Sequence, residues 1–217
     1  MVFREAQLIS SYPARLALAG YNRWMELHHT EDRDHAKGVA SLEALLAARL
    51  HDPFSFLGAH VEHGDRVVRV FYPNAAEAWI NMGSSLDQMS RVHPDGVFEW
   101  RGALFPPLPY LLRIENRNAG PEASVYDTYD AYAFPPQISD HDLYLFNEGR
   151  LWQAYRTLGS HSVEINGVAG VRFSVWAPNA ERVSVVGNFN GWDGRMHPMA
   201  ARGFSGVWEL FIPGLLP

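Results

Sequence analysis

One short corner of the sequence brings together side chains that could bind a ligand and residues that form turns. Residues 187–194 read GNFNGWDG and follow an apolar run. Turn-forming residues place such a stretch at a corner, where the chain is normally exposed. A solvent-facing Trp192 offers a rigid apolar plane to the flat C–H face of a sugar ring. Asn188, Asn190 and Asp193 offer hydrogen bonds to the hydroxyl groups at the edge of that ring.

The residue types alone leave two interpretations of Trp192. The ring either stands out as a sugar platform or folds back as a packing anchor. A single stacking site of this kind is weak, with a dissociation constant of roughly 1 mM, or about −4 kcal/mol. Weak sites suit polymers, because many repeats raise the effective concentration.

No other stretch carries a recognisable catalytic or metal-binding pattern. The sequence has no G-x-x-x-x-G-K-[ST], no H-E-x-x-H and no G-x-S-x-G. It also has no cysteine for a disulfide, a thiolate nucleophile or a metal. HHTEDRDH (28–35) lacks a standard ligand spacing and is interpreted as a solvated loop. DHD (140–142) lies in a connector, and two aspartates at i and i+2 do not by themselves face one substrate. We expect no catalytic residue, no metal and no cofactor.

Composition narrows the classes of partner. The chain has 217 residues, enough for about two domains, and 47% of them are hydrophobic. The net charge is −6 and there is no basic run, which argues against nucleic acid and against an anionic membrane surface. The N-terminus lacks the apolar region of a signal peptide, and no run of 18 apolar residues occurs. A cytoplasmic protein is the default expectation.

The elements that must position the corner are predicted to be strands after a helical start. Ser41 caps a stripe of leucines, and Asp52-Pro53 ends that helix. After Pro53 the hydrophobic period changes to two, and turn clusters recur at short intervals, which predicts antiparallel sandwiches. The predicted strands are VVRVFY (67–72), AWINM (78–82), VFEWRGA (97–103), YLLRIEN (110–116), VRFSVWA (171–177), RVSVVGN (182–188) and VWELFIP (207–213).

An internal repeat divides these strands into two sets. The matching segments are LGAH (57–60) with LGSH (158–161), VFYPNA (70–75) with VWAPNA (175–180), and GVFEW (96–100) with GVWEL (206–210). Three matches in the same order indicate two tandem β-modules. His60 and His161 recur at equivalent positions, which predicts a structural hydrogen bond at a turn rather than catalysis. The aromatic residues at matching strand positions are predicted to be core or interface residues; they are Phe71, Phe98, Trp176 and Trp208.

The predicted fold class is mostly β, with two tandem immunoglobulin-like β-sandwich modules after a short helical segment. The predicted divisions are a helical segment 1–50, a first module 51–118, an aromatic-rich connector 119–157 and a second module 158–217. The connector is expected to pack along a domain surface, with HDLYLFNEGR as a short helix. The second copy stops short of a counterpart to the strand 110–116, so the second sandwich is expected to be truncated.

The same residues resemble a known family. VRFSVWAPNAERVSVVGNFNGWDGRMHPM (171–199) and GVWELFIPG (206–214) closely resemble the family 48 carbohydrate-binding module of glycoside hydrolase family 13 enzymes. Within that group, HDPFSFLGAH (51–60), YDAYAFPP (129–136) and DLYLFNEGRLWQAYRTLGSH (142–161) resemble bacterial 1,4-α-glucan branching enzymes. The resemblance covers roughly residues 40–217.

This resemblance implies an enzyme of glycogen synthesis that cuts an α-1,4 glucan and re-attaches the piece through an α-1,6 bond. It implies retaining chemistry with two carboxyl groups at strand ends of a (β/α)8 barrel that follows the second module. The barrel and the family's D-x-x-x-N-H signature are absent from the sequence. The chain is therefore expected to be inactive alone. Its expected partners are an α-1,4-glucan or glycogen and, within the same protein, the missing barrel.

For sugar binding, the resemblance implies that Trp192 stacks on glucose, with Asn190 a weaker candidate at the same corner. The repeat favours a surface role, because GSSLDQMS (83–90), the counterpart of the corner in the first module, has no aromatic residue near the Trp192 position. That surface role is either glucan contact or docking onto the barrel. Two alternatives for the whole chain are a standalone glucan-binding regulatory module and the N-terminus of an isoamylase-type debranching enzyme.

Overall fold

The computed structural model describes residues 37–62, 64–117 and 125–215. The chain divides into two compact units, residues 1–40 and 41–217, and every strand discussed below belongs to the second. The HHTEDRDH stretch (28–35) lies outside the described residues, as does most of the predicted helical segment. Within the described part, residues 37–46 are helical, and Leu45 and Leu50 are buried. None of the described helices is both long and apolar enough to cross a membrane.

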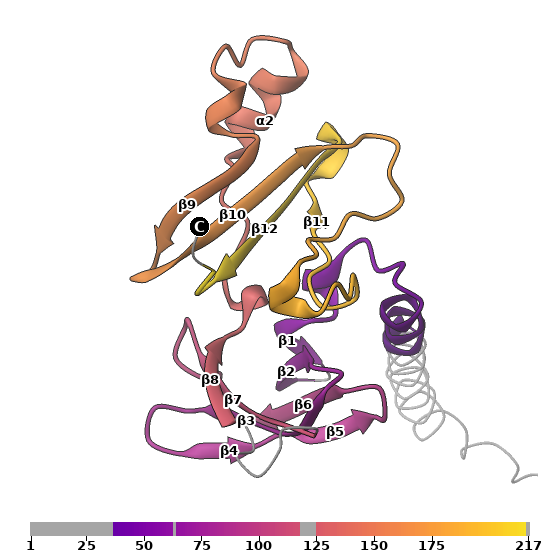
Figure 1. Ribbon diagram of the computed structural model, residues 1–217, viewed down its shortest axis with the longest axis vertical. Helices are drawn as coiled ribbons and strands as arrows, with labels where there is room; N and C mark the ends of the chain where they lie inside the picture. The colour runs from indigo at the N-terminus through magenta and orange to yellow at the C-terminus, as the bar shows by residue number, and fades with distance from the viewer. Residues whose placement is uncertain (1–36, 63, 118–124, 216–217) are drawn as a thin grey trace, which may run out of the picture. The chain divides into compact units, whose positions relative to one another are not determined.

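The first module is a sandwich of two antiparallel four-stranded sheets (Figure 1). In spatial order, sheet A contains β1 (Gly58–Glu62), β2 (Asp65–Phe71), β6 (Val97–Gly102) and β5 (Ser90–His93). Sheet B contains β4 (Leu86–Gln88), β3 (Ala75–Asn81), β7 (Leu111–Asn116) and β8 (Val125–Tyr129). In β3, Ala78 and Ile80 are buried while Glu77 is exposed, which is the alternation expected of a strand with one covered face.

The second module contributes one described sheet, sheet C. Its spatial order is β11 (Ala200–Ala201), β12 (Val207–Pro213), β10 (Val168–Trp176) and β9 (Gly159–Ile165). Read from β9, this order repeats that of sheet A: β9, β10, β12 and β11 correspond to β1, β2, β6 and β5. Neighbouring strands are antiparallel in both sheets. The internal repeat predicted from sequence is therefore confirmed at the level of topology.

The two repeated histidines also have the predicted structural role. The ring of His60 lies 3.3 Å from the Gly58 carbonyl oxygen, and the ring of His161 lies 3.0 Å from that of Leu158. Each ring therefore bonds to a backbone carbonyl at the turn that enters its sheet.

The strand predicted at 182–188 is wrong. This segment forms only an isolated bridge between Ser184 and Pro198, and the Val185 amide donates to the His197 carbonyl at 3.0 Å. Its counterpart β3 is held between two neighbours, β4 and β7. Among the described residues, no segment supplies 182–188 with the ladder that β7 gives to β3. Apolar alternation without a partner strand therefore leaves an extended loop.

The connector contributes more than a covering segment. β8 pairs with β7 and so extends sheet B, and the predicted short helix is present as α2 (Asp140–Asn147), capped by the Ser139 side chain. Glu209 of β12 is fully buried and accepts hydrogen bonds from the backbone amides of Gln137 at 2.6 Å and Ile138 at 3.0 Å. These bonds hold the connector against sheet C.

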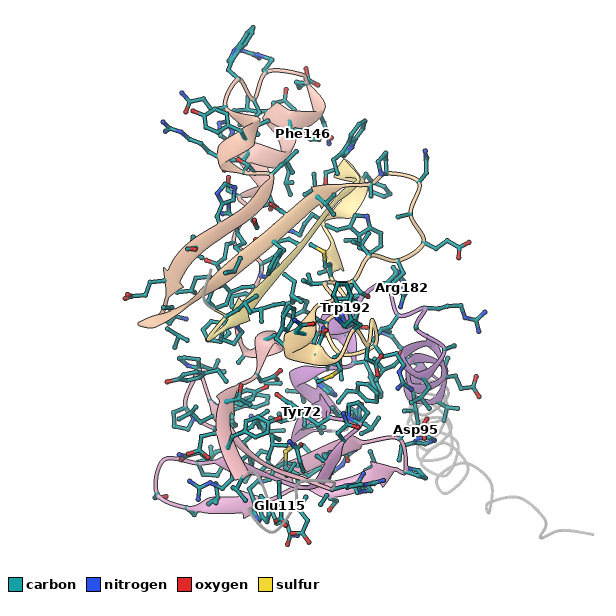
Figure 2. The ribbon with its side chains drawn as sticks, in the orientation of Figure 1. Tyr72, Asp95, Glu115, Phe146, Arg182 and Trp192 are labelled. Carbon is teal, nitrogen blue, oxygen red and sulfur yellow. The ribbon has the colours of Figure 1, made fainter. Side chains whose placement is uncertain are left out.

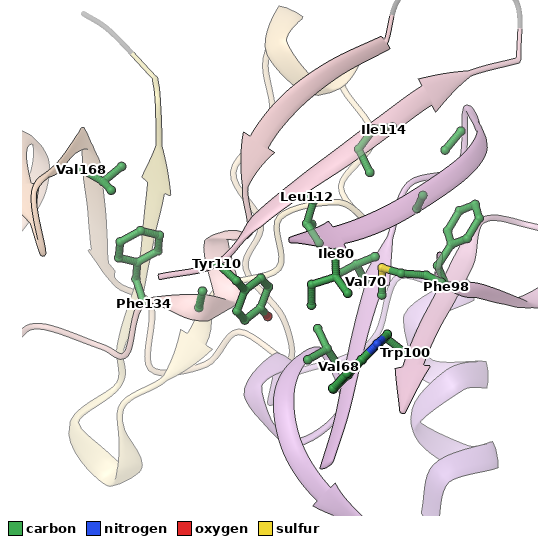
Figure 3. Close-up of a cluster of buried hydrophobic side chains, with 14 of the residues drawn as sticks. Val68, Val70, Ile80, Phe98, Trp100, Tyr110, Leu112, Ile114, Phe134 and Val168 are labelled. Atoms are coloured by element: carbon green, nitrogen blue, oxygen red, sulfur yellow. The ribbon is translucent and has the colours of Figure 1, made fainter. Parts of the chain in front are cut away.

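The hydrophobic core is shared by the two modules. Buried side chains of sheets A and B meet between the sheets, and Phe134 of the connector continues the same cluster toward Val168 and Phe211 of sheet C (Figure 3). The rings of Phe134 and Phe211 make an edge-to-face contact with centroids 4.9 Å apart. As predicted, Phe71, Phe98 and Trp208 are buried, and they belong to clusters of this shared core. Trp176 differs: it is 56% exposed and contacts Phe146 of α2.

Candidate functional site

The 187–194 corner is a tight backbone turn. Its first residues form a 3-10 helix, η4 (Asn188–Asn190), after which Gly191 has a left-handed φ of 60°. Trp192 follows with a φ of 62°, and its backbone N–H donates to the Gly187 carbonyl oxygen at 3.0 Å. Two successive left-handed residues reverse the chain within the corner.

Trp192 is held in an exposed and strained position. Its side chain is 66% exposed, and the indole N–H donates to the Asn188 side-chain oxygen at 3.0 Å. A bulky residue with positive φ is uncommon and costs about 1–2 kcal/mol, whereas glycine would take this conformation freely. The packing anchor is thus not observed: the fold presents an oriented aromatic plane at its surface.

Asn190, the second predicted contact, is buried beneath the corner with 5% of its surface exposed. Its side-chain oxygen accepts from the Gly187 amide at 2.9 Å, and its amide nitrogen donates to the Val185 carbonyl oxygen at 2.9 Å. The same nitrogen lies 2.9 Å from Nδ1 of His197. This arrangement lets Asn190 fix the shape of the turn.

His197 supports the corner from below as a neutral ring. Nδ1 of His197 accepts a hydrogen bond from the Asn190 side-chain amide. Protonation of Nδ1 would place one N–H donor against another, which disfavours the charged ring. Burial lowers the pKa of His197 from its ordinary 6.5 to about 4. The ring also makes an edge-to-face contact with Phe189, at a centroid distance of 5.5 Å.

Asp193 is paired within the corner. Its carboxylate accepts from the Arg195 guanidinium at 2.7 Å, and this hydrogen bond lowers the pKa of Asp193. Asn188 accepts from Trp192, so all three polar side chains predicted to meet sugar hydroxyls are engaged inside the corner. The aromatic plane is the group that the corner presents most openly.

The DHD stretch (140–142) has a structural role. Asp142 of the DHD stretch donates its backbone amide to the Ser139 hydroxyl at 3.1 Å, which is a helix cap. No group of three or more metal-ligating side chains occurs within the residues that the structure describes.

Glu62 and Glu99 both bind Arg69, and hydrogen bonding to Arg69 helps to lower the pKa of Glu62 to about 2. Such a carboxylate stays charged and is unsuited to act as a general acid.

Two adjoining pockets, called here the junction pockets, lie where the corner meets the first module. Their volumes are about 210 and 170 Å³. Four residues line both of them: Tyr72, Tyr126, Phe189 and Met196. Sequence reasoning missed these pockets because residues far apart in the chain, from β8 and from the corner, meet there only in the folded molecule.

Asp130 is the buried carboxyl group of the larger pocket. It accepts from the Tyr110 hydroxyl at 2.6 Å and from the Tyr132 amide at 3.1 Å. Burial nevertheless raises its pKa to about 6. A raised pKa in a pocket is a property of catalytic acids, but no second carboxylate is among the described residues that line this pocket. Asp130 therefore lacks the partner that retaining glycoside chemistry requires.

Each of the two modules matches a known protein family. Residues 157–217 match carbohydrate-binding module 48, described as the isoamylase N-terminal domain. Residues 39–129 match the N-terminal domain of the alpha-1,4-glucan branching enzyme GlgB. The fold and the corner thus define a chain of tandem β-modules whose second module is of the carbohydrate-binding class.

Individual relatives agree with these matches. The chain is 67% identical over 191 residues to the 1,4-alpha-glucan branching enzyme GlgB of Nitrosospira multiformis, covering 88% of this chain and 26% of that protein. It is 58% identical to the GlgB of Nitrosomonas europaea over 79% of this chain and 23% of that protein. The chain corresponds to the N-terminal region of GlgB branching enzymes, and it spans about a quarter of the length of these relatives.

A solved pullulanase from Anoxybacillus sp. aligns with 71% of this chain and 22% of its own, at 13% identity and a TM-score of 0.20. A likeness at that level carries no argument about this fold.

Proposed function

We propose that this chain is the glucan-binding N-terminal region of an enzyme that transfers α-1,4-glucan segments to form α-1,6 branches. The proposal is supported by the carbohydrate-binding module and by relatives named 1,4-alpha-glucan branching enzymes. It includes the divisions 51–118, 119–157 and 158–217, a catalytic barrel elsewhere in the whole protein, and a cytoplasmic location. The bound partner is an α-1,4-glucan such as glycogen.

Within this region, Trp192 is the residue that contacts glucan. The observation that carries the assignment is a tryptophan kept at a left-handed, exposed position where glycine would be less strained. Strain of this kind persists where the surrounding structure enforces it, and it gathers at ligand-binding sites. The hydrogen bond from the indole to Asn188 orients the ring before any ligand arrives, which reduces the ordering cost of binding.

Asn190 is assigned a positioning role at the same site. Its side chain is buried, and both of its polar atoms bond within the protein. It acts on glucan through the turn that it holds, so its loss disturbs the geometry of Trp192.

The assignment is tested with Trp192→Ala in the full-length protein on a glycogen affinity gel. Loss of the stacking plane is expected to weaken retention roughly tenfold, in the range of an aromatic contact residue. The melting temperature is expected to change by less than about 2 °C, because the ring is mostly exposed. Trp152→Ala is the matched control, since Trp152 is 91% exposed and lies outside the corner.

Unchanged retention in Trp192→Ala would remove the platform assignment. A large fall in melting temperature with normal retention would instead assign Trp192 to packing, either within the module or against the remainder of the protein. Equal losses in Trp192→Ala and Trp152→Ala would show that the corner is not the specific contact.

A further inference from the structure

The junction pockets have the chemical lining of a sugar site, although the family comparisons assign nothing to them. Their shared walls are aromatic, formed chiefly by Tyr72, Tyr126 and Phe189. Residues with polar side chains also line the pockets, including Asp130 in one pocket and Asn74 in the other. Apolar planes interrupted by a few convergent polar groups are typical of small-molecule sites and match the faces and edges of a pyranose.

Asp130 retains capacity to bind a ligand. An ionised carboxylate offers about four lone-pair sites, and Asp130 uses two of them, for the Tyr110 hydroxyl and the Tyr132 amide. Both bonds hold the carboxylate in place at the wall of the larger pocket. A hydroxyl donor entering that pocket would therefore meet a fixed, charged acceptor, and hydrogen bonds to charged groups are the stronger ones.

The pockets are continuous with the corner. Phe189, Asn190 and Gly191 line the smaller pocket, and Gly191 immediately precedes Trp192. One turn of backbone thus presents Trp192 on its outer side and Phe189 to the pockets. Figure 2 labels Trp192 on the second module and Tyr72 on the first, on the two sides of this junction.

The size of the pockets limits the occupant. A volume of about 210 Å³ lies below the roughly 300–1,000 Å³ of pockets for drug-sized ligands. That space accepts one sugar ring but not a folded polypeptide segment. Part of the lining is open to solvent, since Tyr126 is 39% exposed and Phe189 is 43% exposed.

We propose that the junction pockets form a second glucan subsite, occupied by glucosyl units of the same α-1,4-glucan chain that stacks on Trp192. The proposal rests on the function proposed above. It gives the two β-modules a joint task, because Tyr72 comes from the first module, Tyr126 from the connector strand β8 that extends sheet B, and Phe189 from the second module. Two linked weak subsites bind one chain more tightly than either does alone.

The test is hydroxyl-radical footprinting of the full-length protein with and without maltoheptaose. This method reads the exposure of individual side chains, so glucan bound elsewhere in the enzyme does not confuse the result. Trp192, Tyr126 and Phe189 are expected to lose at least half of their oxidation rate. Trp152 and Tyr155, which are 91% and 67% exposed, serve as internal controls for radicals consumed by the sugar. Cellohexaose, a β-1,4 oligomer, is the ligand control.

The outcomes separate this inference from the function on which it rests. Protection of Trp192 without Tyr126 and Phe189 would overturn the second subsite and leave the platform standing. Protection of Tyr126 and Phe189 without protection of Trp192 would contradict two claims: that one glucan chain occupies both subsites, and that Trp192 contacts glucan. If all three residues oxidise at unchanged rates with saturating maltoheptaose, both proposals fail.

A variant strengthens the same experiment. Tyr126→Ala removes a partly exposed ring, and it is expected to abolish the protection of Phe189 while Trp192 remains protected. Tyr155→Ala is the matched control. Should Tyr126→Ala fail to fold, Tyr126→Phe keeps the ring and is expected to retain protection. Full protection of Phe189 in a folded Tyr126→Ala variant would contradict the subsite.

Discussion

Trp192 and Asn190 lie two residues apart, and the fold gives them opposite environments. Trp192 is exposed at a strained backbone position, whereas Asn190 is buried with its polar atoms bonded. Two titratable groups, Asp130 and His197, line the larger junction pocket, and His197 contacts Asn190. Burial disfavours the charged form of both, so it raises the pKa of Asp130 to about 6 and lowers that of His197 to about 4.

These two shifts have opposite effects on stability as the pH falls. His197 binds fewer protons folded than unfolded between pH 6.5 and about 4, so its contribution to stability is complete above pH 6.5 and is lost toward pH 4. Asp130 binds more protons folded than unfolded between about pH 6 and 3.8, so acidification relieves the cost of its buried charge. The two groups partly offset each other in that window.

His197→Gln is predicted to remove the acid-sensitive contribution. At about 1.4 kcal/mol per pKa unit, the shift of His197 corresponds to a loss of up to about 3 kcal/mol on full titration. Glutamine keeps an acceptor for the Asn190 amide and does not titrate. Urea unfolding of residues 1–217 between pH 7 and 4.5 should therefore show the wild-type chain losing more stability than the variant. Parallel stability curves for the two proteins would contradict this account.

At the scale of elements, the corner is stabilised by side-chain bonds to its own backbone. Residues 182–188 lack the ladder of backbone hydrogen bonds that a paired strand has. The Asn190 side chain bonds part of this segment instead, because it donates to the Val185 carbonyl and accepts from the Gly187 amide. A Cβ added at Gly187 would lie 2.6 Å from the Phe189 ring, so a larger residue at 187 would have to displace that ring. The corner is thus a local unit whose shape depends on a few residues.

Asn190→Ala is predicted to destabilise the chain and to weaken glycogen retention through that loss of shape. Removing the side chain leaves the part-buried Gly187 amide and Val185 carbonyl without their partners, which costs about 1–3 kcal/mol. Thermal unfolding measures the effect. Asn188→Ala is the control, because Asn188 bonds an exposed indole and its loss should cost under about 1 kcal/mol. Normal stability with lost retention would indicate a direct glucan contact instead.

The sequence predicted elements wherever local pattern and partner strands agreed. Alternation located β3 and β7, and the predicted short helix is present as α2. The repeat predicted two tandem β-modules, and sheets A and C have matching strand orders. It was wrong at 182–188 because a strand needs a neighbour that no local pattern reveals. The tyrosines of β8 lie in a stretch without a sustained period, and their pairing with β7 depends on contacts made in three dimensions.

The candidate site was predictable to the same extent. Turn residues around Trp192 indicated an exposed corner, and the structure shows an exposed ring. The burial of Asn190 was not predictable, because asparagine also favours turns and only the fold decides which way its side chain points. The positive φ of Trp192 had no sequence signal, since the residue type argues against it.

At the scale of the whole molecule, the two modules share one core. Phe134 of the connector packs against Tyr129 of sheet B on one side and Phe211 of sheet C on the other, at centroid distances of 6.2 and 4.9 Å. Together with the bonds from Glu209 to the connector, this contact joins sheet B, the connector and sheet C.

Phe134→Ala is predicted to destabilise both modules together. Phe134 is 1% exposed, and large-to-small changes of buried phenylalanine cost about 3–5 kcal/mol. Calorimetry of residues 1–217 should show one transition in the wild-type chain and a lower melting temperature in the variant. Phe204→Ala, at a side chain that is fully exposed, is the matched control and should change stability by less than about 0.5 kcal/mol. Two separate transitions in the wild-type chain would show that the modules do not share their core.

Under the proposed function, the chain 1–217 is predicted to leave the iodine-staining spectrum of amylose unchanged, and the full-length protein is predicted to alter it. Retaining transfer requires two carboxyl groups about 5 Å apart, one of them able to donate a proton near neutral pH. Among the described residues, Glu62 and Glu99 are fixed by Arg69, and the low pKa of Glu62 prevents proton donation. Asp130 has a suitable pKa but no carboxylate partner in the lining of its pocket. A change in the amylose spectrum with purified 1–217 would mean that the modules carry chemistry of their own.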